Sequence, residues 1–410
     1  MLEQFKTSLD YRVNILYVGL QGMYWMMVCC CVSLGSAYLS NRGYSTFSIG
    51  VLFAMAYLLA TLVQQVVSVV TDDSAEFDVL DVLAVFGIVV VITLFIALFT
   101  HDNSFFTGFT FLIAALVVTV IQPFLNALNF YIERMGISMN YGVARASGSF
   151  CFFIMSLIAG FFMKVASEKT APFLGFLTAL GFTAIIIWIF RELKSAGLRK
   201  NTYDPFERSS SEAMDSAYIN SFINEHRMFF LYLIGLICFY FGHVIINNFL
   251  YQITVNVGGD EGTNGGLLAL QAIVELPAMI FFNRLRDRFG TKTLLGVSAV
   301  FYLVKIYFTA IAVNVGMLYF SMIFQALGFA LFIPASVHLV DEIMSKKDAV
   351  KGQAFVTMAM TFSSLIASIF GGLIINILGV NTTLWMSTFI TVVGVVISIY
   401  ALFRINTQKV

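Results

Sequence analysis

Runs of about twenty apolar residues recur along the chain and restrict the folds open to it. A helix of roughly 20 apolar residues crosses the hydrocarbon core of a bilayer, and it satisfies its own backbone hydrogen bonds in lipid. We expect about twelve such spans, near residues 13–39, 46–70, 79–100, 104–130, 142–165, 171–191, 228–253, 262–283, 293–312, 315–340, 353–378 and 382–403. The hydrophobic share of 59% is above, and the charged share of 11% is below, the values of soluble domains, which are roughly 45–50% and about 25%. The sequence therefore predicts an all-α membrane protein.

The long hydrophilic stretch near the middle divides the predicted spans into six and six. Pro123 and Pro334 lie about half the chain apart, and Asp72 and Asp287 have nearly the same spacing. Such offsets indicate a repeat, and paired repeats are common in transporters. We predict two pseudo-symmetric six-helix bundles joined by a linker, namely an N-terminal bundle over 1–191, a cytoplasmic linker over 192–227 and a C-terminal bundle over 228–410.

The distribution of Lys and Arg predicts the orientation. With both termini cytoplasmic, 18 of the 23 basic residues face the cytoplasm, and Arg42, Lys164 and Lys169 face outward. We expect a multi-pass protein of the plasma (inner) membrane of a bacterium, acting as a monomer in the lipid bilayer. The net charge of zero offers no field for nucleic acid. The five cysteines lie within apolar runs without metal-ligand spacing, so we expect no metal and no cofactor.

The loop after the eighth predicted span carries Asp287, Arg288, Gly290 and Lys292. This pattern resembles the loop motif of the major facilitator superfamily, in which an acid, basic residues and Gly bind the ends of neighbouring helices. The resemblance implies the major facilitator fold and a gating role for these residues. The matching first-half loop begins with Asp72 but is acidic over 72–81 and has no Lys or Arg. That acidic loop is either a solvated turn or a surface that senses cations or docks a partner.

The fifth predicted span opens with Gly-Val-Ala-Arg, ending at Arg145, and Phe152 follows seven residues later. This segment resembles the oligosaccharide–proton symporter branch, the lactose permease-like transporters. There the arginine holds the sugar and the aromatic residue stacks on its ring. The alternative for Arg145 is a side chain that extends to the membrane interface.

Glu275 in the eighth span and Lys305 in the ninth match a glutamate and a basic residue of the same branch. The resemblance implies solute contact for Glu275 and proton coupling for both, although Lys305 is equally compatible with a structural ion pair. Ionisable groups within spans are costly and therefore suggest function. Phe329 and Phe332 replace the His and Glu that carry the proton in the tenth helix of that branch, so its coupling does not transfer intact.

Uncharged polar residues at helical spacing complete the predicted site. Asn126 and Asn129 lie in span four, and His243 and Asn247 share a face of span seven. Asn126 takes the place of a glutamate of the branch, and His243 takes that of an acid. We expect them to line a solute cavity, with His243 also a candidate for proton coupling. The alternative is hydrogen bonding between packed helices.

These features favour a secondary active transporter that moves a small hydrophilic solute, such as a sugar, an oligosaccharide or a nucleoside-like compound, by proton symport with alternating access. The alternative is proton-coupled efflux of amphipathic compounds, which the many aromatic residues would suit. A polytopic receptor or enzyme is a third possibility. The sequence shows no phosphate-binding loop and no cluster of catalytic type, so we expect no enzymatic activity.

Overall fold

The computed structural model describes residues 2–73, 78–198, 222 and 225–405, and all elements in these ranges are helical. Eleven of these helices are long and apolar enough to cross a membrane. The last of them, α16 (Lys346–Arg404), has 59 residues and would be about 90 Å long if straight. It is interrupted at Gly379, where φ is 83°, so it provides two crossings. The predicted all-α membrane fold is confirmed.

Two compact units make up the chain, one of Met1–Tyr44 with Met55–Ser209 and the other of Ser45–Ala54 with Ser210–Val410. The predicted linker over 192–227 falls largely outside the described residues. The helical elements of the first half are α1 (Leu2–Val28), η1 (Cys29–Ser33), α2 (Gly35–Asn41), α3 (Thr46–Asp73), α4 (Val79–Ala97), α5 (Phe105–Arg134), α6 (Tyr141–Val165) and α7 (Thr170–Ser195).

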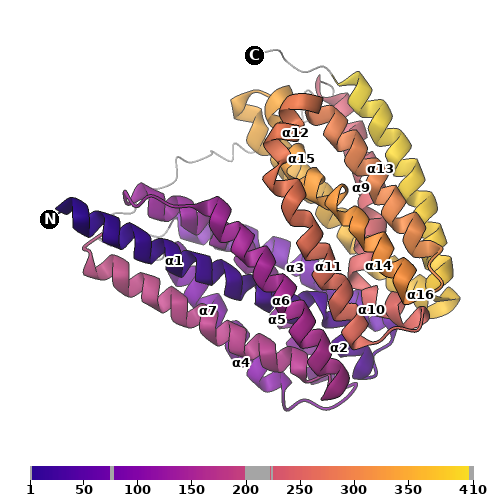
Figure 1. Ribbon diagram of the computed structural model, residues 1–410, viewed down its shortest axis with the longest axis horizontal. Helices are drawn as coiled ribbons and strands as arrows, with labels where there is room; N and C mark the ends of the chain where they lie inside the picture. Colours follow the sequence, from indigo (N-terminus) through magenta and orange to yellow (C-terminus); the bar gives the residue numbers. More distant parts are fainter. Residues whose placement is uncertain (1, 74–77, 199–221, 223–224, 406–410) are drawn as a thin grey trace. The chain divides into compact units, whose positions relative to one another are not determined.

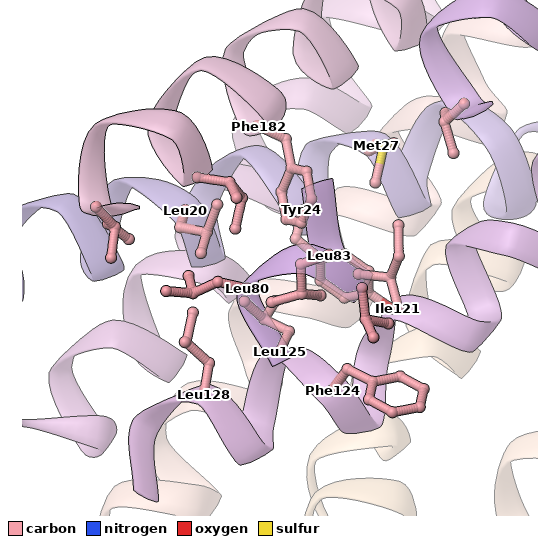
Figure 2. Close-up of a cluster of buried hydrophobic side chains, with 14 of the residues drawn as sticks. Leu20, Tyr24, Met27, Leu80, Leu83, Ile121, Phe124, Leu125, Leu128 and Phe182 are labelled. Carbon is pink, nitrogen blue, oxygen red and sulfur yellow. The ribbon is translucent and has the colours of Figure 1, made fainter. Parts of the chain in front are cut away.

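In the first unit, α1 packs against α6 and α7, and α4 packs against α5 and α7 (Figure 1). Figure 2 shows the apolar side chains between these helices, among them Leu20 and Tyr24 from α1, Leu83 from α4 and Phe182 from α7. Lipid tails are as apolar as these side chains, so close packing rather than water exclusion holds helices together in a bilayer.

The helical elements of the second half are α9 (Arg227–Asn248), α10 (Leu250–Asn256), α11 (Glu261–Ile280), α12 (Phe282–Phe289), α13 (Thr291–Ala310), α14 (Val315–Ile323), η2 (Phe324–Ala326), α15 (Phe329–Ile343) and α16. The helix α9 packs along α16, while α13 contacts α14, α15 and α16. A Cβ at Gly235 would lie 2.2 Å from the Ser398 Oγ, and one at Gly394 would lie 2.5 Å from the Phe239 nitrogen. Small residues therefore allow α9 and α16 their close approach.

Three predicted spans are broken rather than continuous. The first contains the π-helical turn η1. The seventh breaks at Phe249, between α9 and α10. The tenth contains the 3-10 turn η2, and the Ser298 Oγ donates to the Gly328 carbonyl behind it over 2.8 Å. Irregular backbone at membrane depth needs such internal partners, and short π and 3-10 stretches often mark functional positions.

Candidate functional site

A line of hydrogen-bonded polar side chains crosses the second unit from α13 to α11. The Lys305 Nζ donates to the Gln271 Oε1 over 2.8 Å and to the Gln325 Oε1 over 2.7 Å. The Gln325 Nε2 in turn donates to the Glu275 Oε1 over 2.7 Å. Gln271 and Glu275 are four residues apart on α11 and so share a face. We call Gln271, Glu275, Lys305 and Gln325 the polar bridge.

The chemistry of its two ends fixes the orientation of the Gln325 amide. An ammonium group only donates, so the Gln325 oxygen must face Lys305, and an ionised carboxylate only accepts, so the nitrogen must face Glu275. Lys305 is 2% exposed and Gln325 is 4% exposed, whereas Glu275 is half-buried. A buried charge without partners would be costly. The bridge thus gives Lys305 two oxygen acceptors and places a carboxylate of opposite charge one amide away.

The aromatic residues beside the bridge surround His243. Its ring stacks on Phe329 of α15 with the centroids 5.1 Å apart, and it meets Tyr302 of α13 edge-on at the same separation. The Asn247 Nδ2 and the His243 Nε2 are 2.9 Å apart. Phe332, the other aromatic replacement in span ten, is fully buried and lies 6.0 Å from Tyr302 between ring centroids. The structure thus brings His243, Asn247, Phe329 and Phe332 into one cluster around Tyr302.

Three buried polar atoms of this region have no hydrogen-bond partner among the described residues. They are the His243 Nδ1, the Gln271 Nε2 and the Tyr302 hydroxyl. Buried polar groups in folded proteins nearly always have a partner, which can be water or a ligand. Water or a ligand would supply the partners that these atoms lack within the described part of the protein.

In the first unit, the Arg145 guanidinium group lies over an aromatic ring. Its guanidinium carbon is 4.2 Å from the Trp25 ring centroid, and its Nη1 donates to the Ser149 Oγ over 3.0 Å. Phe152 meets the Trp25 ring edge-on, with ring centroids 6.5 Å apart. Gly148 makes room for the indole, because a Cβ there would lie 2.3 Å from the Trp25 Cδ1. Arg145 and Phe152 are therefore held together by Trp25 of α1.

The two asparagines of span four occupy different environments. The Asn126 Oδ1 accepts from the Tyr141 hydroxyl over 3.2 Å, and Tyr141 shares a face of α6 with Arg145. Asn129 is 2% exposed, and its Oδ1 finds no partner among the residues that the structure describes. Asn126 therefore adjoins the Arg145 cluster, while Asn129 points into the packed interior.

The gating-loop residues of the second half lie at the junction of α12 and α13. Asp287 is exposed and pairs with Arg286 over 3.0 Å, and Arg288 is also exposed. Gly290 has φ of 79° and separates the two helices, a conformation that favours glycine. Lys292 donates to the Ile405 carbonyl over 2.5 Å, just beyond α16. Asp72 is near the end of α3, and its side chain lies outside the described residues.

Sequence reasoning missed two residues that the geometry makes prominent. Trp25 carried no signal beyond its aromatic character, although tryptophan is rare in this chain. Gln325 lies three residues before a Gly in an apolar run, and its polar neighbour at helical spacing is a single serine, Ser321. In the described part of the chain, no three His, Cys, Asp or Glu side chains are placed to hold a metal ion.

Comparison with known proteins shows which families and folds this chain resembles. The sequence model of the MFS_1 like family matches residues 17–386. A mutant of the nucleoside transporter NupG has a TM-score of 0.78 at 16% identity, covering 97% of this chain and 100% of that one. A peptide transporter POT mutant has a TM-score of 0.70 at 11% identity, covering 97% and 94%. A bacterial homolog of the human lysosomal transporter Spinster has a TM-score of 0.68 at 11% identity, covering 98% of each chain.

Among curated proteins, multidrug resistance protein 2 of Bacillus subtilis is 26% identical over 140 residues. The match covers 34% of this chain and 35% of that protein, so the chain matches about a third of the length of this relative. The structural likenesses, all below 25% identity, show the fold alone.

Proposed function

The chain belongs to the MFS_1 like family of membrane transporters, and on that premise we propose that it moves a small hydrophilic solute by proton symport with alternating access. The observation that carries this proposal is the polar bridge. Ionisable side chains in membrane spans are costly and are kept where a pathway or a proton relay needs them. A buried Lys305 connected to Glu275 through one amide is such an arrangement.

The charges of the bridge favour an uncharged solute. Lys305 and Glu275 carry opposite charges when both are ionised, so the bridge is neutral as a whole. A charged solute would leave one net charge in a medium of low dielectric constant. Sugars, oligosaccharides and nucleoside-like compounds are uncharged and rich in hydroxyl groups, and the unpartnered atoms of His243, Gln271 and Tyr302 would give such groups hydrogen bonds.

Proton coupling is assigned to Glu275, with Lys305 and His243 as neighbouring titratable groups. Protonation of Glu275 would permit solute binding, and release of that proton would accompany delivery. In the first unit, Arg145 and Phe152, held by Trp25, form a second set of solute-contacting groups in keeping with the lactose permease-like pattern. The termini would be cytoplasmic in an inner membrane, and the Asp287 loop would act in gating.

A solute panel tests this function most simply. Purified protein is heated with neutral sugars, nucleosides, anionic sugar phosphates and hydrophobic cations, and the melting temperature is read for each. We expect stabilisation by at least one neutral hydroxylated compound and none by the sugar phosphates. Stabilisation by hydrophobic cations alone would contradict the proposal.

That contrary outcome would favour proton-coupled efflux of amphipathic compounds. One observation supports this second candidate, namely the partial similarity to a multidrug resistance protein. The aromatic cluster of Trp25 and Phe152 would suit flat apolar compounds, but Arg145 over the indole ring would repel cationic ones.

A further inference from the structure

The hydrogen bonds of the Gln325 side chain show which groups Lys305 and Glu275 can bind. Its carbonyl oxygen accepts from Lys305 and its amide nitrogen donates to Glu275, both over 2.7 Å. Donor and acceptor lie side by side on one planar amide edge. Lys305 and Glu275 therefore present a complementary pair, a donor next to an acceptor, to whatever group lies between them.

The position of Gln325 in the chain would allow its side chain to move out of the polar bridge. It lies in η2, the 3-10 turn between α14 and α15, and Gly328 follows with φ of −81° and ψ of −91°. A 3-10 stretch within a longer helix often marks a hinge. Regular helix on both sides would hold a side chain more firmly than this turn does. Glu275 is half-buried while Lys305 and Gln325 are buried, so the Glu275 side of the bridge is the accessible one.

We propose that Gln325 is an internal stand-in for the solute, and that the transported compound presents an amide-like edge, an N–H beside a C=O, to Glu275 and Lys305. The inference rests on the transport function proposed above and specifies its solute class. Among small neutral compounds that also carry hydroxyl groups, nucleosides with a lactam edge, such as uridine, have this pattern. The stacked rings of His243 and Phe329, the latter four residues after Gln325, lie beside the bridge and would contact a flat base.

Methylated uridines test, on the unaltered protein, whether the solute binds through its amide-like edge. Uridine, 3-methyluridine and 5-methyluridine are titrated into purified protein, and the dissociation constants are measured by calorimetry. The 3-methyl group removes the N–H of the edge, whereas the 5-methyl group adds the same bulk elsewhere. Because the hydrogen bond from the ring N–H to the Glu275 carboxyl group is lost, we expect 3-methyluridine to bind about tenfold or more weakly than uridine. We expect 5-methyluridine to bind within a fewfold of uridine. Uracil and ribose, titrated separately, show whether the base alone is bound.

A matched pair of variants tests the stand-in. Gln325→Met and Gln271→Met each remove one oxygen acceptor from Lys305, and Gln325→Met also removes the donor to Glu275. Only Gln325→Met removes the amide group that lies between Lys305 and Glu275. We expect uridine to bind Gln325→Met at least as tightly as the parent, because no internal amide has to be displaced. We expect Gln271→Met to show no gain.

Equal binding of uridine and 3-methyluridine would overturn the inference, as would a loss of uridine affinity in Gln325→Met greater than in Gln271→Met. Binding of sugars without any base-bearing compound would overturn it as well, while leaving the proposed transport function standing. If no solute of the broader panel were bound or taken up, the proposed function itself would fail.

Discussion

At the scale of single residues, Lys305 and Glu275 are predicted to stabilise each other through Gln325. Lys305→Met should destabilise the protein by about 3 kcal/mol, because it leaves the Glu275 charge in the membrane without its counterpart. Glu275→Gln in the same chain should recover at least half of that loss. Thermal or denaturant unfolding of the purified variants measures both values. Losses that simply add in the double variant would show that the two charges do not interact.

A second residue-scale prediction concerns Arg145. Arg145→Lys keeps the charge but loses the planar group that lies over Trp25, at a cost of about 1 kcal/mol. If the cluster contacts the solute, affinity should fall about fivefold while the yield of folded protein stays unchanged. Arg134→Lys, at the exposed end of α5, is the matched control. Equal solute affinity in both variants would remove Arg145 from the site.

At the scale of elements, Pro123 shapes α5 through the hydrogen bond it cannot make. Proline has no N–H, so the carbonyl four residues earlier loses its helical partner. That carbonyl belongs to Thr119, and the Gln64 Nε2 of α3 donates to it over 3.0 Å. Gln64→Leu should therefore cost about 1–2 kcal/mol in the parent. In a Pro123→Ala background the restored backbone N–H can donate to the Thr119 carbonyl, and the cost should fall by about half. An unchanged cost in the unfolding measurements would rule out this compensation.

The helices also show which features of the fold the sequence could predict. Apolar length predicted the spans, because the bilayer imposes it regardless of tertiary contacts. The breaks at Phe249 and in η2 were not predictable, since no proline lies at Phe249 or within η2 to signal an interruption. The sequence predicted only part of the polar bridge. Glu275 and Lys305 were identified as charges within spans, whereas Gln325 gains its importance from contacts with α11 and α13, which only the folded unit shows.

At the scale of the whole molecule, the predicted orientation can be tested by labelling from one side. An impermeant maleimide applied to sealed right-side-out cells should modify Val313→Cys, which lies in the loop before α14 and is 77% exposed. It should not modify Ser210→Cys in the predicted cytoplasmic linker. The parent, whose five cysteines lie in apolar spans, serves as the unlabelled control. Labelling at Ser210 in intact cells would reverse the orientation.

Transport assays test most directly whether Glu275 couples a neutral solute to protons, as we propose. Protein reconstituted into liposomes is given an inward proton gradient, and uptake of radiolabelled uridine, or of whichever neutral compound the solute panel identifies, is followed with and without a protonophore. We expect accumulation above the outside concentration, abolished by the protonophore. We also expect that Glu275→Gln, which mimics the protonated side chain, exchanges solute but does not accumulate it. Accumulation by Glu275→Gln equal to that of the parent would show that Glu275 does not couple the solute to protons.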